Sequence, residues 1–263
     1  ILQNRCIGCG SCINICPEEA IIFHTSKKQA IEFIQSENKT AALVAPSISG
    51  EFPDISDYRK FVGMIRALGF DYVMEVSFGV DIVANAYKNL LEDFKGKYYI
   101  TSLCPVVVSN IEKFHPELID NLAPIVSPMI ATARIAKKIH GENIKTIYIG
   151  PCLENKHDTE KYSDIDVVLT FIELRELFKE FKIEEKKLEF SDFDPPFGNK
   201  GSLYPLSNGI IEAAELDQKA MTSSVITTEG RNDFIEAIKK FETSVDQINK
   251  HFNIFYCDGC LMG

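Results

Sequence analysis

The sequence contains no tryptophan, no long apolar run and fewer basic than acidic residues, with 28 Lys and Arg against 38 Asp and Glu. The absence of tryptophan excludes no class of protein, but the shortage of basic residues and the absence of a long apolar run each exclude one. A formal net charge of −10 argues against nucleic acid as a partner, because phosphate binding needs a basic patch. No segment reaches the ~20 apolar residues that span a bilayer, and the N-terminus has no secretory signal sequence. We therefore expect a cytoplasmic protein with no membrane span.

The sequence does contain eight cysteines in 263 residues, of which 45% are hydrophobic. A chain of this size can bury a sizeable core, which predicts one large domain with a small appendage. In a reducing cytosol, cysteines favour metal binding over disulfides. The start at Ile1 and the end at Gly263, soon after a cysteine of ligand type, lead us to expect a piece of a longer chain.

Four of the cysteines lie close together near the N-terminus, at the spacing C-x2-C-x2-C-x3-C-P. They are Cys6, Cys9, Cys12 and Cys16. This is the bacterial ferredoxin spacing, and it predicts a [4Fe–4S] cluster; a zinc knuckle or buried free thiols are the alternatives. In two-cluster ferredoxins the fourth cysteine of such a run binds the other cluster. Cys16 therefore either closes a single cluster or pairs with a motif upstream of Ile1.

Beyond this motif the apolar pattern alternates between strands and helices from Thr40 onwards. A short helix to about Glu37 precedes the alternation, with a capping-box pattern at Ser26. Strands are predicted at 40–45, 72–76, 98–102, 146–149, 166–169, 224–227 and 253–256. Helices are predicted at 57–68, 80–94, 110–115, 128–140, 170–181, 208–219 and 232–241. This order indicates an α/β fold with parallel strands and flanking helices, divided into a ferredoxin-like module at 1–37 and a second domain at 38–263.

The other four cysteines are far apart in sequence, but each follows a predicted strand and adjoins proline or glycine. They are Cys104, Cys152, Cys257 and Cys260. Parallel strands bring their carboxyl ends to one edge, where α/β sheets bind ligands. The pattern predicts a second metal site. Buried free cysteines and a tetrahedral zinc are the alternatives, and the neighbouring ferredoxin motif favours iron.

At this point the chain resembles the iron-only ([FeFe]) hydrogenases. Three signature segments carry the resemblance: Thr101-Ser102-Leu103-Cys104-Pro105, Gly150-Pro151-Cys152 and Cys257-x2-Cys260. It extends, in the same order, through Ala45-Pro46-Ser47, Leu68-Gly69-Phe70-Asp71, Phe78-Gly79-Val80-Asp81, Ser127-Pro128-Met129 and residues 166–170. In that family a ferredoxin-like module feeds a buried H-cluster, a [4Fe–4S] cubane joined to a diiron subsite that carries CO and cyanide.

The resemblance implies that Cys104, Cys152, Cys257 and Cys260 hold the cubane, with Cys260 bridging to a diiron subsite if one is bound. Further cofactor contacts are expected at Ala45, Pro46, Ser47, Ser127, Pro128 and Lys156. Lys156 either donates to an anionic cofactor ligand or is a surface charge. His157 is more readily explained as a solvated side chain than as a ligand.

Several positions around this site depart from the catalytic members of the family. Leu103 stands where the catalytic members have a second cysteine, and Ala86-Tyr87 stand where they have adjacent glutamates. Asn155 replaces a lysine, and Gly150 and Phe255 replace methionines. The last two cysteines are one residue closer together, and Ser207-Asn208-Gly209 replaces a more glycine-rich turn. Hydrogen chemistry needs a proton relay of titratable groups, which leucine cannot supply. The pattern is most similar to the sensory-type branch.

Three functions follow as hypotheses. The first is a hydrogen or redox sensor or electron-transfer module with weak or no H2 turnover. The second is a catalytic hydrogenase that interconverts protons and H2, and the third is a cubane-only scaffold or assembly protein. The expected partners are an electron donor or acceptor such as ferredoxin and, by the resemblance, fused or associated signalling domains.

Overall fold

The computed structural model describes residues 1–219 and 222–260. Its strands form two parallel sheets rather than one. A four-stranded sheet has the order β2-β1-β3-β4, and a two-stranded sheet pairs β5 with β6. The strands are β1 (Thr40–Val44), β2 (Tyr72–Glu75), β3 (Lys145–Gly150), β4 (Val167–Thr170), β5 (Val225–Glu229) and β6 (His251–Phe255). The predicted α/β class with parallel strands is confirmed.

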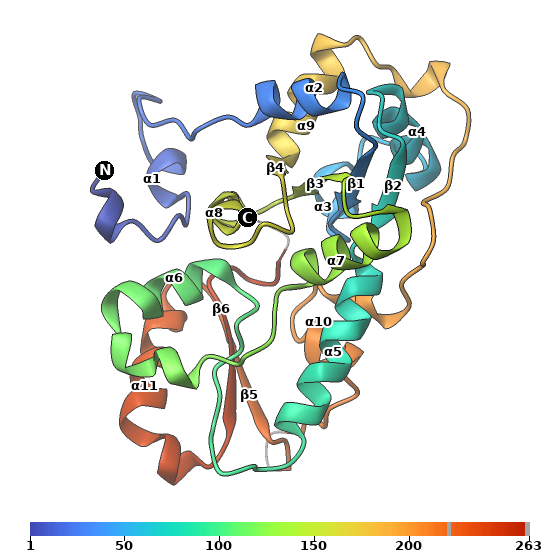
Figure 1. Cartoon of the computed structure of the whole chain (residues 1–263). Helices are drawn as coiled ribbons and strands as arrows, with labels where there is room; N and C mark the ends of the chain where they lie inside the picture. Colours follow the sequence, from blue (N-terminus) through green and yellow to red (C-terminus); the bar gives the residue numbers. More distant parts are fainter. Residues whose placement is uncertain (220–221, 261–263) are drawn as a thin grey trace.

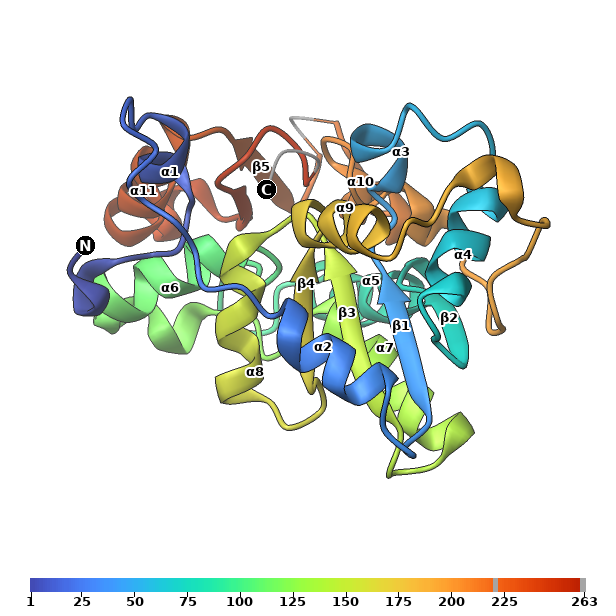
Figure 2. The ribbon, with the colours of Figure 1, turned by 90° about the horizontal axis from the view of Figure 1, so that it is seen from above.

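Helices cover both faces of the larger sheet. α7 (Pro128–His140) lies on one face with α5 (Ser77–Leu91) beyond it, and α2 (Lys27–Ile34) and α9 (Phe171–Glu180) lie on the other (Figure 2). The remaining helices are α1 (Ser11–Asn14), α3 (Ile48–Glu51), α4 (Tyr58–Ala67), α6 (Pro105–Phe114), α8 (Asp158–Lys161), α10 (Gly209–Ala213) and α11 (Asp233–Ile248). The N-terminal segment with α1 extends to one side, at the left of Figure 1, while α6 and α11 flank the smaller sheet.

Three helices begin at residues whose side chains accept backbone N–H groups. The side chain of Asp57 accepts the N–H of Arg59, and that of Ser127 accepts the N–H of Ile130. Thr170 and Glu173 form the complete capping box at α9. Each cap satisfies backbone donors that the helix leaves without partners, and so fixes where the chain turns after β1, before α7 and after β4.

The capping box predicted at Ser26 is wrong, because another carboxylate takes the backbone donor. Ser26 makes no side-chain cap bond; its N–H donates to Glu173 Oε1 at 2.6 Å and its hydroxyl accepts from Lys156. Tertiary contacts thus replace the local cap.

The segment at 98–102 is extended but is not a strand of either sheet. It forms only an isolated bridge at Ile100, whose partners are Leu122 and Phe252. Thr101 donates its N–H to Phe252, so the segment runs beside β6. The residues after it enter α6 at Pro105, five positions before the predicted start, because proline suits the first position of a helix. The predicted helix at 208–219 is also too long: α10 ends at Ala213, and Glu215 has φ +55°.

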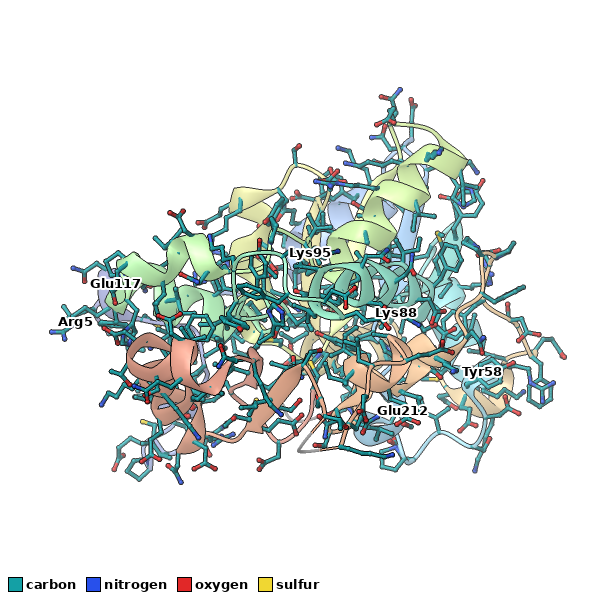
Figure 3. The ribbon with its side chains drawn as sticks, turned by 90° about the horizontal axis from the view of Figure 1, so that it is seen from below. Arg5, Tyr58, Lys88, Lys95, Glu117 and Glu212 are labelled. Carbon is teal, nitrogen blue, oxygen red and sulfur yellow. The ribbon has the colours of Figure 1, made fainter. Side chains whose placement is uncertain are left out.

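The core is apolar and continuous between the two sheets. β1 and β6 are buried along their whole lengths. Exposed charged side chains such as Arg5, Lys95, Glu117 and Glu212 project outwards (Figure 3). Across the described ranges 1–219 and 222–260, we find no helix long and apolar enough to cross a membrane.

Candidate metal centre

The N-terminal cysteines lie on a loop that wraps around α1. Gly8 and Gly10 adopt φ +64° and +72°, a region that favours glycine, and the chain can therefore turn sharply between successive cysteines. All four thiols are half-buried and unpaired. The pKa of Cys16 is lowered, mainly by backbone N–H donation from Ala20, so this sulfur is already surrounded by donors that favour a thiolate.

Two of the contacts that hold this loop against the large domain involve Cys6 and Gly8. The ammonium of Lys113 donates to the carbonyl oxygen of Cys6. Gly8 packs so closely on Glu154 that an added Cβ would lie 1.4 Å from the carboxylate Oε2. Gly8 is thus required both for its backbone angle and for its lack of a side chain.

The other four cysteines converge from three elements. Cys104 precedes α6, Cys152 follows β3, and Cys257 and Cys260 follow β6. Their thiols influence one another: burial, and then the charge of Cys104, raise the pKa of Cys152, and the same causes raise those of Cys257 to about 11 and Cys260 to about 12. Such mutual effects require the sulfurs to be close together. The four predicted ligands therefore lie near one another, with Cys104 buried and the other three partly buried.

The chemistry of these four cysteines suits a metal that binds thiolates. Four buried thiols with raised pKa values are neutral near pH 7 until a metal displaces their protons. Tetrahedral zinc with Zn–S bonds near ~2.3 Å needs sulfurs about 3.8 Å apart. Among the described residues, only His115, Glu117 and Glu242 bring three ligand atoms within 4.8 Å of one another. Among the described residues no three cysteine sulfurs lie this close to one another, and a cubane would attach each thiolate to a different iron.

A small cavity adjoins Cys152 and Cys260. It measures about 30 Å³, which holds roughly two water molecules. Five of the predicted cofactor contacts line it: Ala45, Pro46, Ser47, Ser127 and Pro128. The rest of the wall includes Leu103, Met129 and the rings of Tyr148 and Tyr204.

The tyrosine rings fill much of the space beside Cys260. A Cβ added to Gly150 would lie 2.4 Å from the Tyr148 hydroxyl oxygen, so the ring of Tyr148 lies directly on this glycine. Burial and then the nearby charge of Cys260 raise the pKa of Tyr148 and of Tyr204 well above the usual range. Neither phenol ionises near neutral pH, and both remain hydrogen-bond donors.

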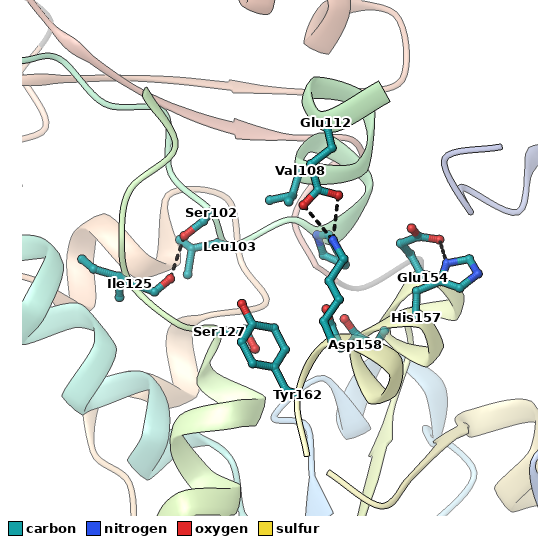
Figure 4. A pocket seen from close by; sticks show the side chains of 13 residues that line it. Ser102, Leu103, Val108, Glu112, Ile125, Ser127, Glu154, His157, Asp158 and Tyr162 are labelled. Carbon is teal, nitrogen blue, oxygen red and sulfur yellow. Dashed lines mark hydrogen bonds and ion pairs between the residues drawn. The ribbon is translucent and has the colours of Figure 1, made fainter. Parts of the chain in front are cut away.

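A second, polar cavity of about 100 Å³ lies on the outer side of Leu103 (Figure 4). On the wall of this cavity, the Lys161 ammonium forms an ion pair with Glu112 Oε2 at a distance of 2.7 Å. Burial raises the pKa of Asp158 to about 6, although Lys161 opposes the shift. Leu103 borders both cavities, as do Pro105, Ser127 and Asn155.

Lys156 and His157 lie outside the cavity beside Cys260. The Lys156 ammonium is bonded to Ser26, to the carbonyl of Val168 and to Glu173, and these contacts occupy its donors. His157 Nδ1 lies 2.8 Å from Glu154, with 46% of the side chain exposed. The cofactor contact expected for Lys156 therefore stays a prediction.

Sequence reasoning missed Tyr256, which lies between the two cysteine groups. Its hydroxyl is 2.6 Å from Ser11 Oγ, in the N-terminal loop, and its own chain position is next to Cys257. Two signals were visible: an aromatic residue directly before a ligand-type cysteine, and a serine between the second and third cysteines of the ferredoxin motif.

Comparisons with known proteins agree with this geometry. Residues 38–261 match the family model "Iron only hydrogenase large subunit, C-terminal domain", and residues 1–22 match "4Fe-4S binding domain". Among solved structures, the fold is similar to a variant of [FeFe]-hydrogenase HydA1 from Chlamydomonas reinhardtii, with a TM-score of 0.70 and 19% identity, covering 90% of this chain and 83% of that one. This likeness supports the fold alone.

Curated relatives include both enzymes and an assembly factor. The chain is 27% identical over 244 residues to "NADP-reducing hydrogenase subunit HndD" of Solidesulfovibrio fructosivorans, covering 80% of this chain and 42% of that protein. It is 24% identical over 230 residues to "Cytosolic Fe-S cluster assembly factor NAR1" of Meyerozyma guilliermondii, covering 76% and 43%. The chain spans less than half the length of these two relatives. Since the family model covers most of its residues, the chain belongs to the iron-only hydrogenase large-subunit family and is an iron–sulfur protein of that fold.

Proposed function

We propose that the chain is an electron-transfer and redox-sensing module of the iron-only hydrogenase fold that does not turn over H2. It holds two [4Fe–4S] clusters. Cys6, Cys9, Cys12 and Cys16 bind the first, and Cys104, Cys152, Cys257 and Cys260 bind the second. When bound, each cluster supplies one-electron transfer. The protein's part is to hold the thiolates, to exclude water from the second site and to keep the two sites in contact.

The observation that carries this proposal is the small cavity beside Cys260. A diiron subsite with its CO and cyanide ligands needs far more room than the ~30 Å³ present, which corresponds to roughly two waters. The resemblance places a methionine at Gly150, and here the ring of Tyr148 takes that space. The cysteines fit a cubane, and the residues around them do not fit a diiron subsite.

At the described positions where the resemblance places the proton relay of the catalytic enzymes, this chain has residues that do not titrate near neutral pH. Leu103 has no titratable group and is buried. At the position of the adjacent glutamates, Tyr87 is buried and its pKa is raised to about 12 by desolvation. Its hydroxyl accepts the N–H of Ser102 and lies 3.0 Å from Ser102 Oγ, which in turn donates to backbone carbonyls. This network anchors the segment before Cys104, and the Tyr87 phenol stays protonated near neutral pH.

The experiment that tests this function is a hydrogen-evolution assay on anaerobically purified protein, treated with the hydrogenase maturation machinery and supplied with a reduced viologen dye. The account predicts no H2 above the level of a Cys152→Ala control, together with reversible reduction of two clusters. Evolution of H2 well above that control contradicts the proposal. The expected electron partner is a ferredoxin-type carrier, with signalling domains elsewhere in the protein.

A second candidate, an iron–sulfur assembly factor, is favoured by the similarity to NAR1. The two candidates differ in what leaves the protein. An assembly factor passes a cluster to an apo-protein that needs [4Fe–4S], and its own iron falls as that protein is activated. A relay keeps its iron through repeated reduction and oxidation.

A further inference from the structure

Two carboxylates converge on one histidine nitrogen at the end of α6. His115 Nδ1 lies 3.5 Å from Glu117 Oε1 and 3.5 Å from Glu242 Oε2. All three ligand atoms lie within 4.8 Å of one another, and no other trio of metal-binding side chains in residues 1–219 and 222–260 is this compact. Glu117 follows His115 closely in the sequence and lies at the outer edge of the molecule (Figure 3). Glu242 comes from α11, so the fold brings the third group to the site.

The distances from His115 Nδ1 are too long for charge-assisted hydrogen bonds and suit a shared cation. A hydrogen bond between a charged N–H and a carboxylate is usually ~2.7–2.9 Å long. In a tetrahedral zinc site whose Zn–N and Zn–O bonds are about 2.1 Å, two ligand atoms lie about 3.4 Å apart. Both distances from the histidine nitrogen are close to that separation. The two glutamates are exposed, so rotation of their side chains can adjust the distance between the carboxylates.

The surrounding backbone holds the histidine and the third ligand in place before any ion binds. His115 ends α6 by donating its N–H to the carbonyl oxygen of Ile111. Only 16% of the histidine side chain is exposed. On α11, Phe241 directly precedes Glu242 and packs edge-on against Phe252 of β6. Ligands on such fixed elements lose little conformational freedom when they bind an ion.

The electrostatic environment of the three side chains also favours a cation. His115 is the C-cap of α6, where the helix dipole places its negative end. Lys113, the basic residue in the last turn of this helix, donates to the carbonyl oxygen of Cys6 in the N-terminal loop. Two carboxylates and a helix C-terminus therefore meet at one imidazole, whose neutral form offers a lone pair to a metal.

We propose that His115, Glu117 and Glu242 form a zinc site, with a water molecule as the fourth ligand. Imidazole nitrogen and carboxylate oxygen are ordinary zinc ligands, whereas magnesium and calcium prefer oxygen alone. The ion joins the end of α6 to α11. Cys104 immediately precedes α6, and α11 leads into the strand before Cys257, so bound zinc braces two of the elements that carry the second cysteine group. Zinc binding here is independent of how many clusters the cysteines hold.

The test is equilibrium dialysis against micromolar zinc of the holoprotein, with its clusters assembled and its iron content measured. The wild type is expected to bind one zinc ion per chain at this site and to melt several degrees higher with zinc than without it. Glu242→Gln keeps the size of the side chain but removes its charge, and His115→Gln removes the imidazole. Each is expected to weaken zinc binding at least about tenfold. Glu236→Gln, at an exposed position elsewhere on α11, is the matched control and is expected to bind zinc as the wild type does.

X-ray absorption at the zinc edge separates this site from the cysteines. Nitrogen and oxygen neighbours at ~2.0–2.2 Å support the proposal, while sulfur neighbours at ~2.3 Å overturn it, because thiolates would then hold the zinc. Equal zinc binding by the wild type and Glu242→Gln also overturns it, even if His115→Gln fails to fold. Stabilisation by magnesium or calcium as large as that by zinc overturns the assignment of the metal.

Discussion

The ammonium of Lys156 lies 2.9 Å from Glu173 Oε2, with 14% and 1% of the two side chains exposed. The pair is located where the N-terminal module enters the large domain, since Glu173 also accepts from Ser26 and Thr25. The same carboxylate completes the capping box of α9. One buried ion pair therefore joins the cluster-bearing module, the segment after Cys152 and the end of β4.

Removing Glu173 leaves Lys156 charged and buried without its partner. Glu173→Ala is expected to destabilise the protein by about 3 kcal/mol, which lowers the melting temperature by roughly 6–9 °C. Lys187→Ala, in an exposed ion pair with Glu184, is the control and is expected to melt as the wild type does. Equal melting temperatures of the two variants would contradict a stabilising role for the ion pair between Lys156 and Glu173.

Cys152→Ala tests the composition of the second site. The variant is expected to lose one cubane, so that iron falls from about eight to about four per chain, measured with acid-labile sulfide. Cys12→Ala is the matched variant and should lose the other cubane, leaving a different spectrum. Unchanged iron in Cys152→Ala contradicts the shared site.

The hydrogen bonds of Tyr87 are predicted to be structural. Tyr87→Phe deprives the Ser102 N–H of its acceptor in a buried setting and is expected to cost about 1–3 kcal/mol of unfolding free energy. Tyr98→Phe, whose hydroxyl is on the surface, is expected to change stability much less. Denaturant titration compares the two. A large change in cluster potential with no change in stability would instead assign Tyr87 a redox role.

His251 predicts a loss of stability in acid. Burial lowers its pKa from 6.5 to about 4, and its Nδ1 accepts the N–H of Tyr99. As the pH falls through 6.5 the unfolded chain takes up a proton that the folded chain refuses until about pH 4. The contribution to stability is therefore present above pH 6.5 and is lost between pH 6.5 and 4, by about 3 kcal/mol.

The measurement for His251 is the melting temperature of wild type and His251→Gln across this range. Glutamine keeps a hydrogen-bond acceptor but does not titrate. The advantage of the wild type over the variant is expected to shrink as the pH falls from 7 to 4.5. Parallel pH profiles would show that His251 does not control acid sensitivity.

Local signals predicted the parts of the fold that local forces determine. Asp57, Ser127 and Thr170 cap helices that were predicted from the apolar pattern, because each cap needs only a backbone N–H two or three residues away. The capping pattern at Ser26 failed because Glu173, distant in sequence, accepts the same donor. Nor did apolar alternation reveal that residues 98–102 pair with Phe252 outside the main sheet, since periodicity does not specify the partner.

For the site, the cysteine spacings were sufficient to name the groups that the structure brings together. The contacts that decide its chemistry were not predictable in this way. Tyr148 lies on Gly150, two residues further along the same strand, and Tyr256 reaches Ser11 only because the N-terminal loop docks beside β6. The second contact joins side chains that are distant in sequence, and cysteine spacing specifies neither.

The most direct test of the central claim is infrared spectroscopy of anaerobically purified, maturation-treated protein in the CO and cyanide stretching region, combined with iron analysis. The account predicts no bands and about eight irons per chain, as expected for two cubanes. Bands in this region, with iron above eight, would show that a diiron subsite binds beside Cys260 and would contradict the claim that Tyr148 and its neighbours close that space.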